Sequence, residues 1–259
     1  MTDDTCLTER EDGIFWIRIN RPQVLNAIDP ATHRAISAAL DSFESDPALR
    51  VAILTGTGER SFCVGTDLKI RAKTNADDHP PTGFAGLTHR FSLAKPVIAA
   101  VNGLAIGGGV EIVVACDLAI AAEHAEFSLP EPRIGLAALG GGVLQRLARQ
   151  MPLKFAMDLV LTGRRLTAAE AQQLGLINAV VPAAELEDKV RSKAEQIMAG
   201  APLAIEASKR VMLESLQFPD LETALSQRYE AAERMLISED AKEGQAAFVE
   251  KRAPRWRGS

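Results

Sequence analysis

Several features that define common protein classes are missing from this chain of 259 residues. Aromatic residues make up only 5% of it, so its core must be built mainly from Ala, Val, Ile and Leu. Its three cysteines, Cys6, Cys63 and Cys116, are odd in number and widely spaced, which excludes a disulfide framework and a Cys-x-x-Cys metal or redox site. Positive charge is not in excess, because 29 Lys and Arg against 34 Asp and Glu give a net charge of -5. That balance argues against nucleic-acid binding, which needs a surplus of basic residues.

Sequence features of membrane association or secretion are also missing. No apolar run reaches the roughly 18 residues of a membrane span. The richest stretch, residues 96–122, is interrupted by Asn102, Glu111 and Asp117. The first residues, MTDDTCLTERED, are acidic and polar, unlike a signal peptide. We therefore expect a cytoplasmic protein that does not associate with membranes.

Familiar catalytic motifs are missing as well. The sequence has no GxxxxGK[ST] phosphate loop, no GxSxG nucleophile elbow and no HExxH metal helix. Its four histidines show no metal-ligand spacing, and we interpret each as a surface or loop residue: His33, His79, His89 and His124. We expect no metal site. Chemistry must then come from carboxylates, main-chain groups or a cofactor that the substrate brings with it.

What is present indicates a globular α/β protein. Hydrophobic residues make up 47% and charged residues 24%, which is ordinary for a soluble domain. The segment 13–20 alternates and places Phe15, Ile17 and Ile19 on one face of a strand. Asp29 followed by Pro30 predicts the start of a helix that runs to about residue 43. Further strands are predicted at 51–55, 96–101 and 117–121, and their alternation with helices predicts a layered α/β fold.

Two later regions differ from this pattern. Residues 70–90 are polar and contain several Pro and Asp residues, which indicates a mobile surface loop and a candidate lid beside a site. After residue 185 the strand pattern stops. Helices are predicted over 186–198, 202–216, 221–237 and 240–250, as a helical subdomain or an oligomerisation element.

The first candidate site lies where a predicted strand ends in three consecutive glycines, residues 107–109. A helix is expected from Gly109 to Cys116, and the free N–H groups at its start would hold negative charge, as in an oxyanion hole. The glycines would also let a ligand approach the main chain closely. Glu111 falls in the first turn of this helix among apolar residues. Its carboxylate either complements the helix dipole or has a function, since burying it alone is costly.

A second carboxylate and a third glycine-flanked position complete the set. Glu131 ends a short predicted strand between two prolines, and its alternative role is a salt bridge to Arg133. On the residues alone, both alternatives stay open for each glutamate. Gly65 precedes Thr66 and would let the Thr66 N–H point into a cleft.

Ordered motifs along nearly the whole chain resemble the enoyl-CoA hydratase/isomerase (crotonase) superfamily. They include ILTGTGERSFCVGTDLK, KPVIAAVNGLAIGGGVE, CDLAIAAEHAEFSLPE and LTGRRLTAAEAQQLGLINAVVP. The resemblance implies an α/β crotonase (ClpP-like) spiral of repeated ββα units, followed by C-terminal helices for trimerisation. We therefore expect a spiral core over residues 1–195 and an oligomerisation region over 196–259, assembled as a homotrimer or a dimer of trimers.

The resemblance also implies the ligand and where it would bind. The substrate would be an acyl-CoA thioester, so that coenzyme A enters with the substrate and no separate cofactor or metal is needed. The N–H groups of Thr66 and Gly108 would form the oxyanion hole for the thioester carbonyl. Lys69 would lie near the adenine–ribose end of coenzyme A. The further substrate contacts that the resemblance implies are Ala27, Val64, Asp67, Leu68, Gly107 and Leu139, together with Thr66 itself.

Glu111 and Glu131 match the two catalytic glutamates of hydratases in this superfamily, at the same separation of 20 positions. The implied reaction is reversible addition of water to a 2-enoyl-CoA thioester. One carboxylate would take a proton from water while one carboxylic acid supplies a proton to the α-carbon. In the family pattern, Glu131 acts at the α-carbon and Glu111 holds the water.

The sequence departs from the hydratase pattern after Glu131. Ala138 replaces a proline, and Leu139 replaces a small residue near the reacting carbons, where it would narrow the acyl pocket or move the water. An aspartate at that position serves other chemistries in the superfamily, so Leu139 disfavours them. The alternatives are a double-bond isomerase that needs one glutamate, and a carnitinyl-CoA dehydratase-like enzyme. A non-catalytic CoA-binding or RNA-binding relative is a further, less favoured alternative, and the net charge of -5 argues against RNA binding.

Overall fold

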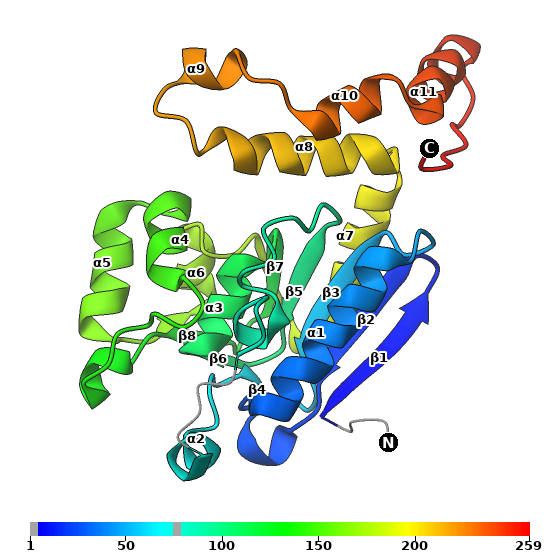
Figure 1. Cartoon of the computed structure of the whole chain (residues 1–259). Coiled ribbons are helices and arrows are strands. Elements are labelled where there is room, and N and C mark those ends of the chain that lie inside the picture. The colour runs from blue at the N-terminus through cyan, green and yellow to red at the C-terminus, as the bar shows by residue number, and fades with distance from the viewer. Residues whose placement is uncertain (1–4, 75–78) are drawn as a thin grey trace.

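The computed structural model describes residues 5–74 and 79–259. Its larger sheet has six strands in the order β1-β2-β3-β5-β7-β10, all parallel to their neighbours except the β1–β2 pair (Figure 1). The strands of this sheet are β1 (Cys6–Glu11), β2 (Ile14–Ile19), β3 (Val51–Gly56), β5 (Val97–Val101), β7 (Leu118–Ala122) and β10 (Ala179–Val181). The predicted strands at 13–20, 51–55, 96–101 and 117–121 are therefore confirmed to within one or two residues.

A second, smaller sheet gives the chain its spiral course. It has the order β4-β6-β8-β9, with strands β4 (Ser61–Cys63), β6 (Leu104–Ile106), β8 (Glu126–Ser128) and β9 (Leu166–Thr167). Three successive pairs, β3–β4, β5–β6 and β7–β8, each give one strand to each sheet. A helix follows each pair: α2 (Leu68–Thr74), α3 (Gly108–Ala115) and the 3₁₀ helix η3 (Glu131–Ile134). This is the repeated ββα course that the sequence led us to expect.

The remaining helices complete the two ends of the chain. Before the first full ββα unit lie η1 (Pro22–Val24) and α1 (Pro30–Ser45), and between the first two units lies η2 (Phe84–Gly86). After the third unit come α4 (Val143–Gln150), α5 (Leu153–Thr162), α6 (Ala168–Gln173), η4 (Ala183–Glu185), α7 (Leu186–Met198), α8 (Pro202–Ser215), α9 (Leu221–Leu225), α10 (Glu230–Leu236) and α11 (Glu239–Glu250). No helix in residues 5–74 or 79–259 is long and apolar enough to span a bilayer.

Strand β2 shows why the larger sheet is buried on both faces. Phe15, Ile17 and Ile19 share one face and pack into the main core, as predicted. Ile14 and Trp16 project to the other face, into a second cluster that includes residues of α7. Parallel sheets covered by helices on both sides have this near-continuous apolar pattern.

Helix α1 begins as its sequence predicts. The Asp29 carboxylate accepts a hydrogen bond from the Thr32 N–H at 2.8 Å, which caps the helix, and Pro30 occupies its first turn. The helix ends at Ser45, two residues beyond the predicted end. It buries Ile36, Leu40 and other apolar residues against the sheet. The candidate site lies on the same face of the sheet as this helix.

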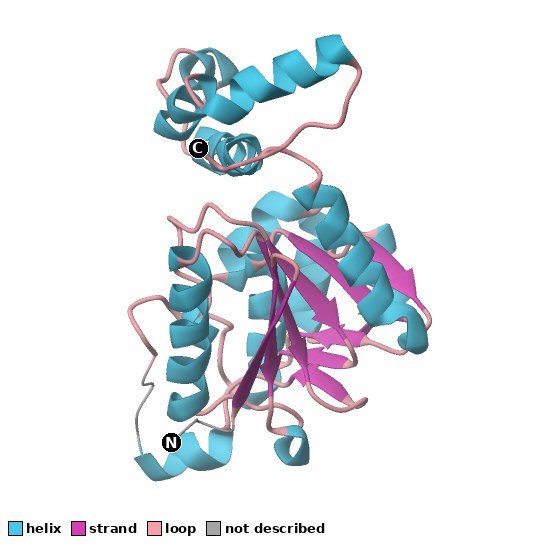
Figure 2. Ribbon diagram, turned by 90° about the vertical axis from the view of Figure 1, so that its right-hand side faces the viewer, coloured by secondary structure: helices cyan, strands magenta, loops and turns pink. Residues whose placement is uncertain are grey.

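The C-terminal helices stand apart from the sheets, beyond α7, in both views (Figures 1 and 2). The predicted continuous helix over 221–237 is wrong, because the chain breaks into α9 and α10. Tyr229 is extended there, and its hydroxyl donates to the Ala224 carbonyl at the end of α9, at 2.8 Å. Helix α10 then packs on α8. The expected division after residue 195 falls inside α7 and stays a prediction.

The expected surface loop over 70–90 is wrong for most of its length. Residues 75–78 lie outside the described residues. Before them the chain is still helical in α2, and after them residues 83–88 are all buried. Phe84 and Leu87 are apolar and become part of the main core under α1. The Pro- and Asp-rich composition of the whole segment therefore led to a wrong prediction for its second half.

Candidate active site

The three consecutive glycines lie at the N-terminus of α3, directly after strand β6. Each touches a different neighbour. A β-carbon on Gly107 would lie 2.6 Å from Glu131 Oε1, one on Gly108 would overlap the Phe84 ring, and one on Gly109 would overlap the Cys63 carbonyl oxygen. We expected room for a ligand at all three glycines. Instead, each has a protein atom against it, and together they bring Glu131, η2 and β4 up to the start of α3.

The two predicted oxyanion-hole residues lie next to each other. Gly65 has a φ of +86°, and a β-carbon there would lie 2.9 Å from the Gly108 nitrogen. Ile28 pairs with this segment by donating to the Gly65 carbonyl and accepting from the Asp67 N–H, each at 2.8 Å. The Thr66 N–H, between those two groups, is therefore directed away from Ile28. The Gly108 N–H belongs to the first turn of α3 and has no acceptor within the helix.

Glu111 is buried in the first turn of α3, with 4% of its surface exposed. The main-chain N–H groups of Gly141 and Val143 donate to its carboxylate. Burial raises its pKa, and the negative charge of Glu131 raises it further, against the opposing effect of Arg146. Its Oε1 has no hydrogen-bond partner among the described residues. The carboxylate is therefore oriented from one side only.

Glu131 is the first residue of η3 and is half-buried. Its Oε1 faces the main chain of Gly107, while its Oε2 is buried without a hydrogen-bond partner in the described part of the chain. Burial raises its pKa. The alternative salt bridge to Arg133 is not formed, because the Arg133 guanidinium donates to the Thr162 carbonyl at 3.1 Å.

The two glutamates form one electrostatic unit. Each has one buried oxygen without a protein partner, which is unusual because nearly all buried polar atoms are hydrogen-bonded. The negative charge of Glu131 raises the pKa of Glu111, in addition to the effect of burial. An acid and a base held close together can move protons at two atoms of one bound molecule.

The predicted contact residue Asp67 faces into the protein. Its carboxylate lies 3.1 Å from the Arg21 guanidinium, which also lies 3.2 Å from Asp29 and donates to the Ala27 carbonyl. The Asp67 N–H and carbonyl are bonded to Ile28 and to the first turn of α2. Asp67 and Ala27 therefore help to hold the Thr66 segment in place, and the Asp67 side chain is not directed to a ligand.

The other predicted contact residues lie around this centre. Val64 is half-buried beside Gly65, and Leu68 and Lys69 are exposed on the first turn of α2. Leu139 is 68% exposed on the loop between Glu131 and Gly141, while the preceding Ala138 is buried. The same loop exposes the apolar side chains of Ile134 and Leu136. The contacts of these positions with a ligand stay a prediction.

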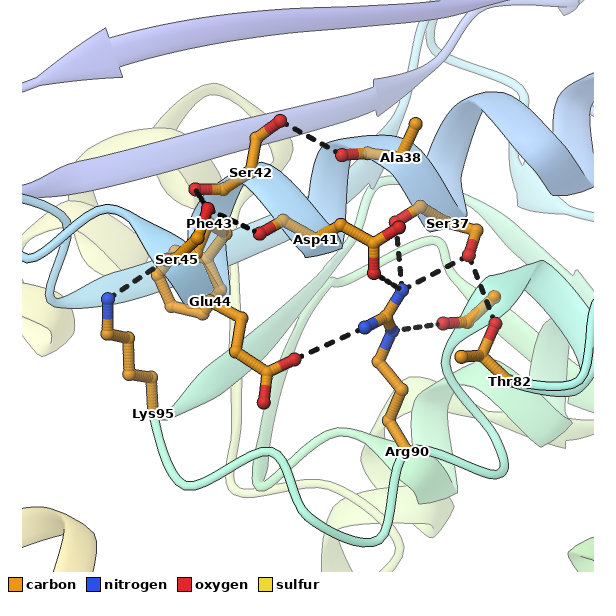
Figure 3. Close-up of polar contacts among 11 residues, drawn as sticks. Ser37, Ala38, Asp41, Ser42, Phe43, Glu44, Ser45, Thr82, Arg90 and Lys95 are labelled. Carbon is orange, nitrogen blue, oxygen red and sulfur yellow. Dashed lines mark hydrogen bonds and ion pairs between the residues drawn. The ribbon is translucent and has the colours of Figure 1, made fainter.

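Arg90 links the segment that carries Phe84 to α1 through hydrogen bonds and an ion pair (Figure 3). The Arg90 guanidinium donates to the carbonyls of Gly86 and Ser37, at 2.6 and 2.8 Å, and pairs with Asp41 at 2.6 Å. Because Phe84 lies against Gly108, this network supports the main chain at one of the two predicted oxyanion-hole donors.

His33 is buried at 3% exposure, so its assignment to the surface or a loop is wrong. Its Nδ1 accepts a hydrogen bond from the Ala85 N–H at 2.8 Å, and its ring lies 4.7 Å from that of Phe84. Burial lowers its pKa to about 3, with a smaller contribution from His79. His33 is therefore a neutral packing residue behind Gly108.

Sequence reasoning missed three residues of this site: Phe84, Gly141 and Arg146. Gly141 lies within a run of three glycines that the sequence shows plainly, but its contact with Glu111 spans 30 positions. Arg146 follows one turn later in α4. Its one signal in the sequence is that a charged residue stands between the apolar residues Val143 and Leu147, which are buried.

Comparison with known proteins identifies the family of this chain. A family model described as enoyl-CoA hydratase/isomerase matches residues 9–259. The chain belongs to the enoyl-CoA hydratase/isomerase family. A carnitinyl-CoA dehydratase of Salmonella arizonae is 46% identical over the full length of both chains. An enoyl-CoA hydratase of Mycobacterium tuberculosis H37Rv superposes with a TM-score of 0.93 at 41% identity, covering 99% of this chain and all of the other.

A second solved structure extends the likeness to another genus. An enoyl-CoA hydratase of Bacillus anthracis has a TM-score of 0.90 at 35% identity, covering 98% of this chain and all of the other. The spiral of ββα units is thus the crotonase fold of the enoyl-CoA hydratase/isomerase family, as the sequence motifs predicted.

Proposed function

We propose that this protein is a hydro-lyase that reversibly adds water to a 2-enoyl-CoA thioester. The observation that carries the proposal is a pair of carboxylates at the start of α3, each with one buried oxygen that has no hydrogen-bond partner among the described residues. Coenzyme A would enter as part of the substrate, and the chemistry would need no further cofactor.

In the proposed reaction, the thioester carbonyl oxygen accepts hydrogen bonds from the N–H groups of Thr66 and Gly108. These donors stabilise the enolate that forms when the hydroxyl oxygen bonds to the β-carbon, an effect typically worth a few kcal/mol per donor. Glu111, ionised, takes the proton from the attacking water. Glu131, protonated, gives its proton to the α-carbon. Dehydration runs through the same groups in reverse.

The electrostatics of the two glutamates support these roles. A raised pKa keeps Glu131 protonated at a higher pH than an ordinary carboxyl, as a general acid requires. Main-chain N–H groups of Gly141 and Val143 and the positive charge of Arg146 lower the pKa of Glu111, against the raising effects of burial and of the Glu131 charge. The base and the acid thus differ in environment, which is how paired carboxylates take opposite roles.

A second candidate substrate comes from the Salmonella relative, named a carnitinyl-CoA dehydratase. Carnitinyl-CoA has a hydroxyl at the β-carbon, so its dehydration is the reverse of hydration and needs the same two glutamates. It also carries a quaternary ammonium group, which proteins usually bind against aromatic faces. The exposed side chains that follow Glu131 include the aliphatic Ile134, Leu136 and Leu139 and the cationic Arg133, and this set favours an uncharged acyl chain.

Double-bond isomerisation is the alternative reaction on the same fold. It needs one glutamate to carry a proton between two carbons, and the second carboxylate would have no task. The orientation of Glu111 by two main-chain N–H groups favours hydration.

The test follows the absorbance of the conjugated enoyl thioester. Purified protein is mixed with crotonyl-CoA, longer and branched 2-enoyl-CoAs, and the trimethylammonium-bearing enoyl-CoA. Glu111→Gln and Glu131→Gln are compared with Glu123→Gln, which alters an exposed glutamate between β7 and β8. We expect hydration that both site variants abolish and the control keeps. Hydration that survives in either site variant would remove that residue from the mechanism.

The substrate panel separates the remaining alternatives. Preference for the trimethylammonium substrate would assign carnitinyl-CoA chemistry. Conversion of a 3-enoyl-CoA to its 2-enoyl isomer, without hydration, would assign the isomerase. Binding of butyryl-CoA without turnover of any of these thioesters would contradict all three reactions.

A further inference from the structure

Arg146 lies one turn into α4, directly beyond the glycine run that faces Glu111. Its side chain is half-buried and points back along the helix. One guanidinium nitrogen donates to the Gly141 carbonyl at 2.7 Å, and another donates to the Thr88 carbonyl. Both acceptors are main-chain groups outside α4, so Arg146 joins two loops that the helix itself does not hold.

The first of these loops orients Glu111. The Gly141 N–H donates to the Glu111 carboxylate, and a β-carbon on Gly141 would lie 2.8 Å from Glu111 Oε2. A change in the angle of the main chain at Gly141 would therefore move the donor away from the carboxylate or drive the Cα into it. The bond from Arg146 to the Gly141 carbonyl restricts that change.

The second loop supports the predicted oxyanion hole. Thr88 is fully buried, and its hydroxyl accepts a hydrogen bond from the Phe84 N–H at 2.9 Å. The Phe84 ring in turn lies against Gly108. Through Thr88, Arg146 connects the loop that orients Glu111 to the turn that lies beneath one oxyanion donor.

We propose that Arg146 is a positioning residue for Glu111, which holds the carboxylate and the oxyanion-hole segment in one fixed arrangement through the main chain of Gly141 and Thr88. This inference rests on the proposed hydro-lyase function, in which Glu111 acts as the base. Arg146 would hold Glu111 in the orientation and the charge state that this role requires. Arg146 does not touch the substrate in this scheme.

The charged and titratable groups that face Glu111 come from three elements. Glu131 in η3 and Cys63 in β4 are acidic groups, and Arg146 in α4 supplies positive charge. The guanidinium favours the ionised form of Glu111, whereas burial and Glu131 disfavour it. Loss of the guanidinium will therefore raise the pKa of Glu111 further.

The test compares Arg146→Met, Arg146→Lys and the control Arg149→Met. Arg149 lies on the same helix, is exposed, and donates only to the carbonyl of Gln145 one turn earlier. For each variant, kcat and KM for crotonyl-CoA hydration are measured across pH, together with the melting temperature and the affinity for butyryl-CoA. Methionine keeps most of the side-chain bulk and removes the charge and donors.

We expect Arg146→Met to lower kcat by about 10- to 100-fold, as expected when a catalytic group loses its orientation, with KM nearly unchanged. The acidic limb of its pH–rate profile should move to higher pH. Arg146→Lys keeps the charge but cannot reach two separate carbonyls as a guanidinium does. It should keep the wild-type acidic limb while kcat falls. Arg149→Met should match the wild type in both.

The inference is overturned if Arg146→Met folds and keeps the wild-type kcat and pH profile, or if KM rises with kcat unchanged. If Arg146→Met does not fold, the kcat of Arg146→Lys decides the question, and a wild-type value contradicts the positioning role.

A second measurement separates this inference from the proposed function. Carbon-13 NMR of labelled glutamate carboxyl groups, assigned with Glu111→Gln, gives the pKa of Glu111 without any turnover. Should the wild type hydrate no enoyl-CoA, a higher Glu111 pKa in Arg146→Met would still support the link between the two residues. An unchanged pKa, together with active wild-type enzyme, would remove the link and leave the hydro-lyase function standing.

Discussion

Gly141 and Glu111 are in such close contact that position 141 has no room for a side chain. A β-carbon there would lie 2.8 Å from both the Cβ and the Oε2 of Glu111. The neighbouring Gly140 is different, because a β-carbon there would lie 3.5 Å from Oε2, an ordinary contact distance. The contact at Gly141 follows from the hydrogen bond between its N–H and the carboxylate.

These two glycines give a matched pair of variants. Gly141→Ala should lower kcat by roughly 100-fold, because either the loop or the carboxylate must shift by a few tenths of an ångström or more. Gly140→Ala should keep most of the activity. Steady-state kinetics with crotonyl-CoA and melting curves for both variants check this. Equal losses in the two would mean that the loop as a whole, and not the contact at Gly141, matters.

The raised pKa values predict that the site costs the protein stability. A carboxyl whose folded pKa lies above its unfolded value of 4.5 binds more protons in the folded state between those two pH values. Stability therefore falls as pH rises through that window, and the loss is complete above the folded pKa. Glu111→Gln should raise the melting temperature at about pH 8 by roughly 2–4 °C.

The pH dependence distinguishes this cause from others. The gain of Glu111→Gln should disappear as the pH falls below 4.5, where the wild-type carboxyl becomes protonated in both states. The control Glu123→Gln should show no such trend. A gain that is constant with pH would point to packing rather than to the buried charge.

Thr66 is predicted to act through its main-chain N–H alone. Thr66→Ala keeps that group and should keep most of the activity. Thr66→Pro removes the N–H and should lower kcat by about 100-fold or more, as for loss of an oxyanion-hole donor. Affinity for butyryl-CoA reports whether the variants still fold and bind. A large loss in Thr66→Ala would show that the hydroxyl takes part.

His33 predicts a second pH effect, of opposite sign. Its pKa falls from 6.5 to about 3 on folding, so the neutral ring contributes stability above pH 6.5 that is lost as the pH falls toward 3. His33→Asn can still accept from the Ala85 N–H but cannot titrate. The variant should be less stable than the wild type at about pH 7.5, and the difference in melting temperature should narrow in acid. A constant difference would mean that the imidazole charge plays no part.

Features set by neighbouring residues could be predicted from the sequence. The strand pattern of Phe15, Ile17 and Ile19 and the cap formed by Asp29 and Pro30 depend on a few adjacent positions, and both are confirmed. The motifs that resemble a known superfamily predicted the fold, which the solved structures confirm. The roles of the two glutamates stay a prediction.

Features set by distant contacts could not be predicted in this way. His33 is polar by type, yet it is buried because Phe84 and Ala85 fold over it from more than 50 positions away. At the break, the Tyr229 hydroxyl donates to the Ala224 carbonyl in the preceding helix, a contact that helical periodicity does not reveal. Arg146 likewise acquires its partners only when three segments meet.

The two N–H groups beside Gly65 have a consequence for redesign of this protein. They belong to the main chain, so no substitution other than proline deletes them, whereas Glu111, Glu131 and Leu139 can each be exchanged. Under the proposed function, activation of the thioester is thus separate from the choice of reaction. A library that varies only positions 111, 131 and 139 would present different acids, bases and pocket shapes to the same activated carbonyl, and would sample new acyl-CoA reactions without rebuilding the scaffold.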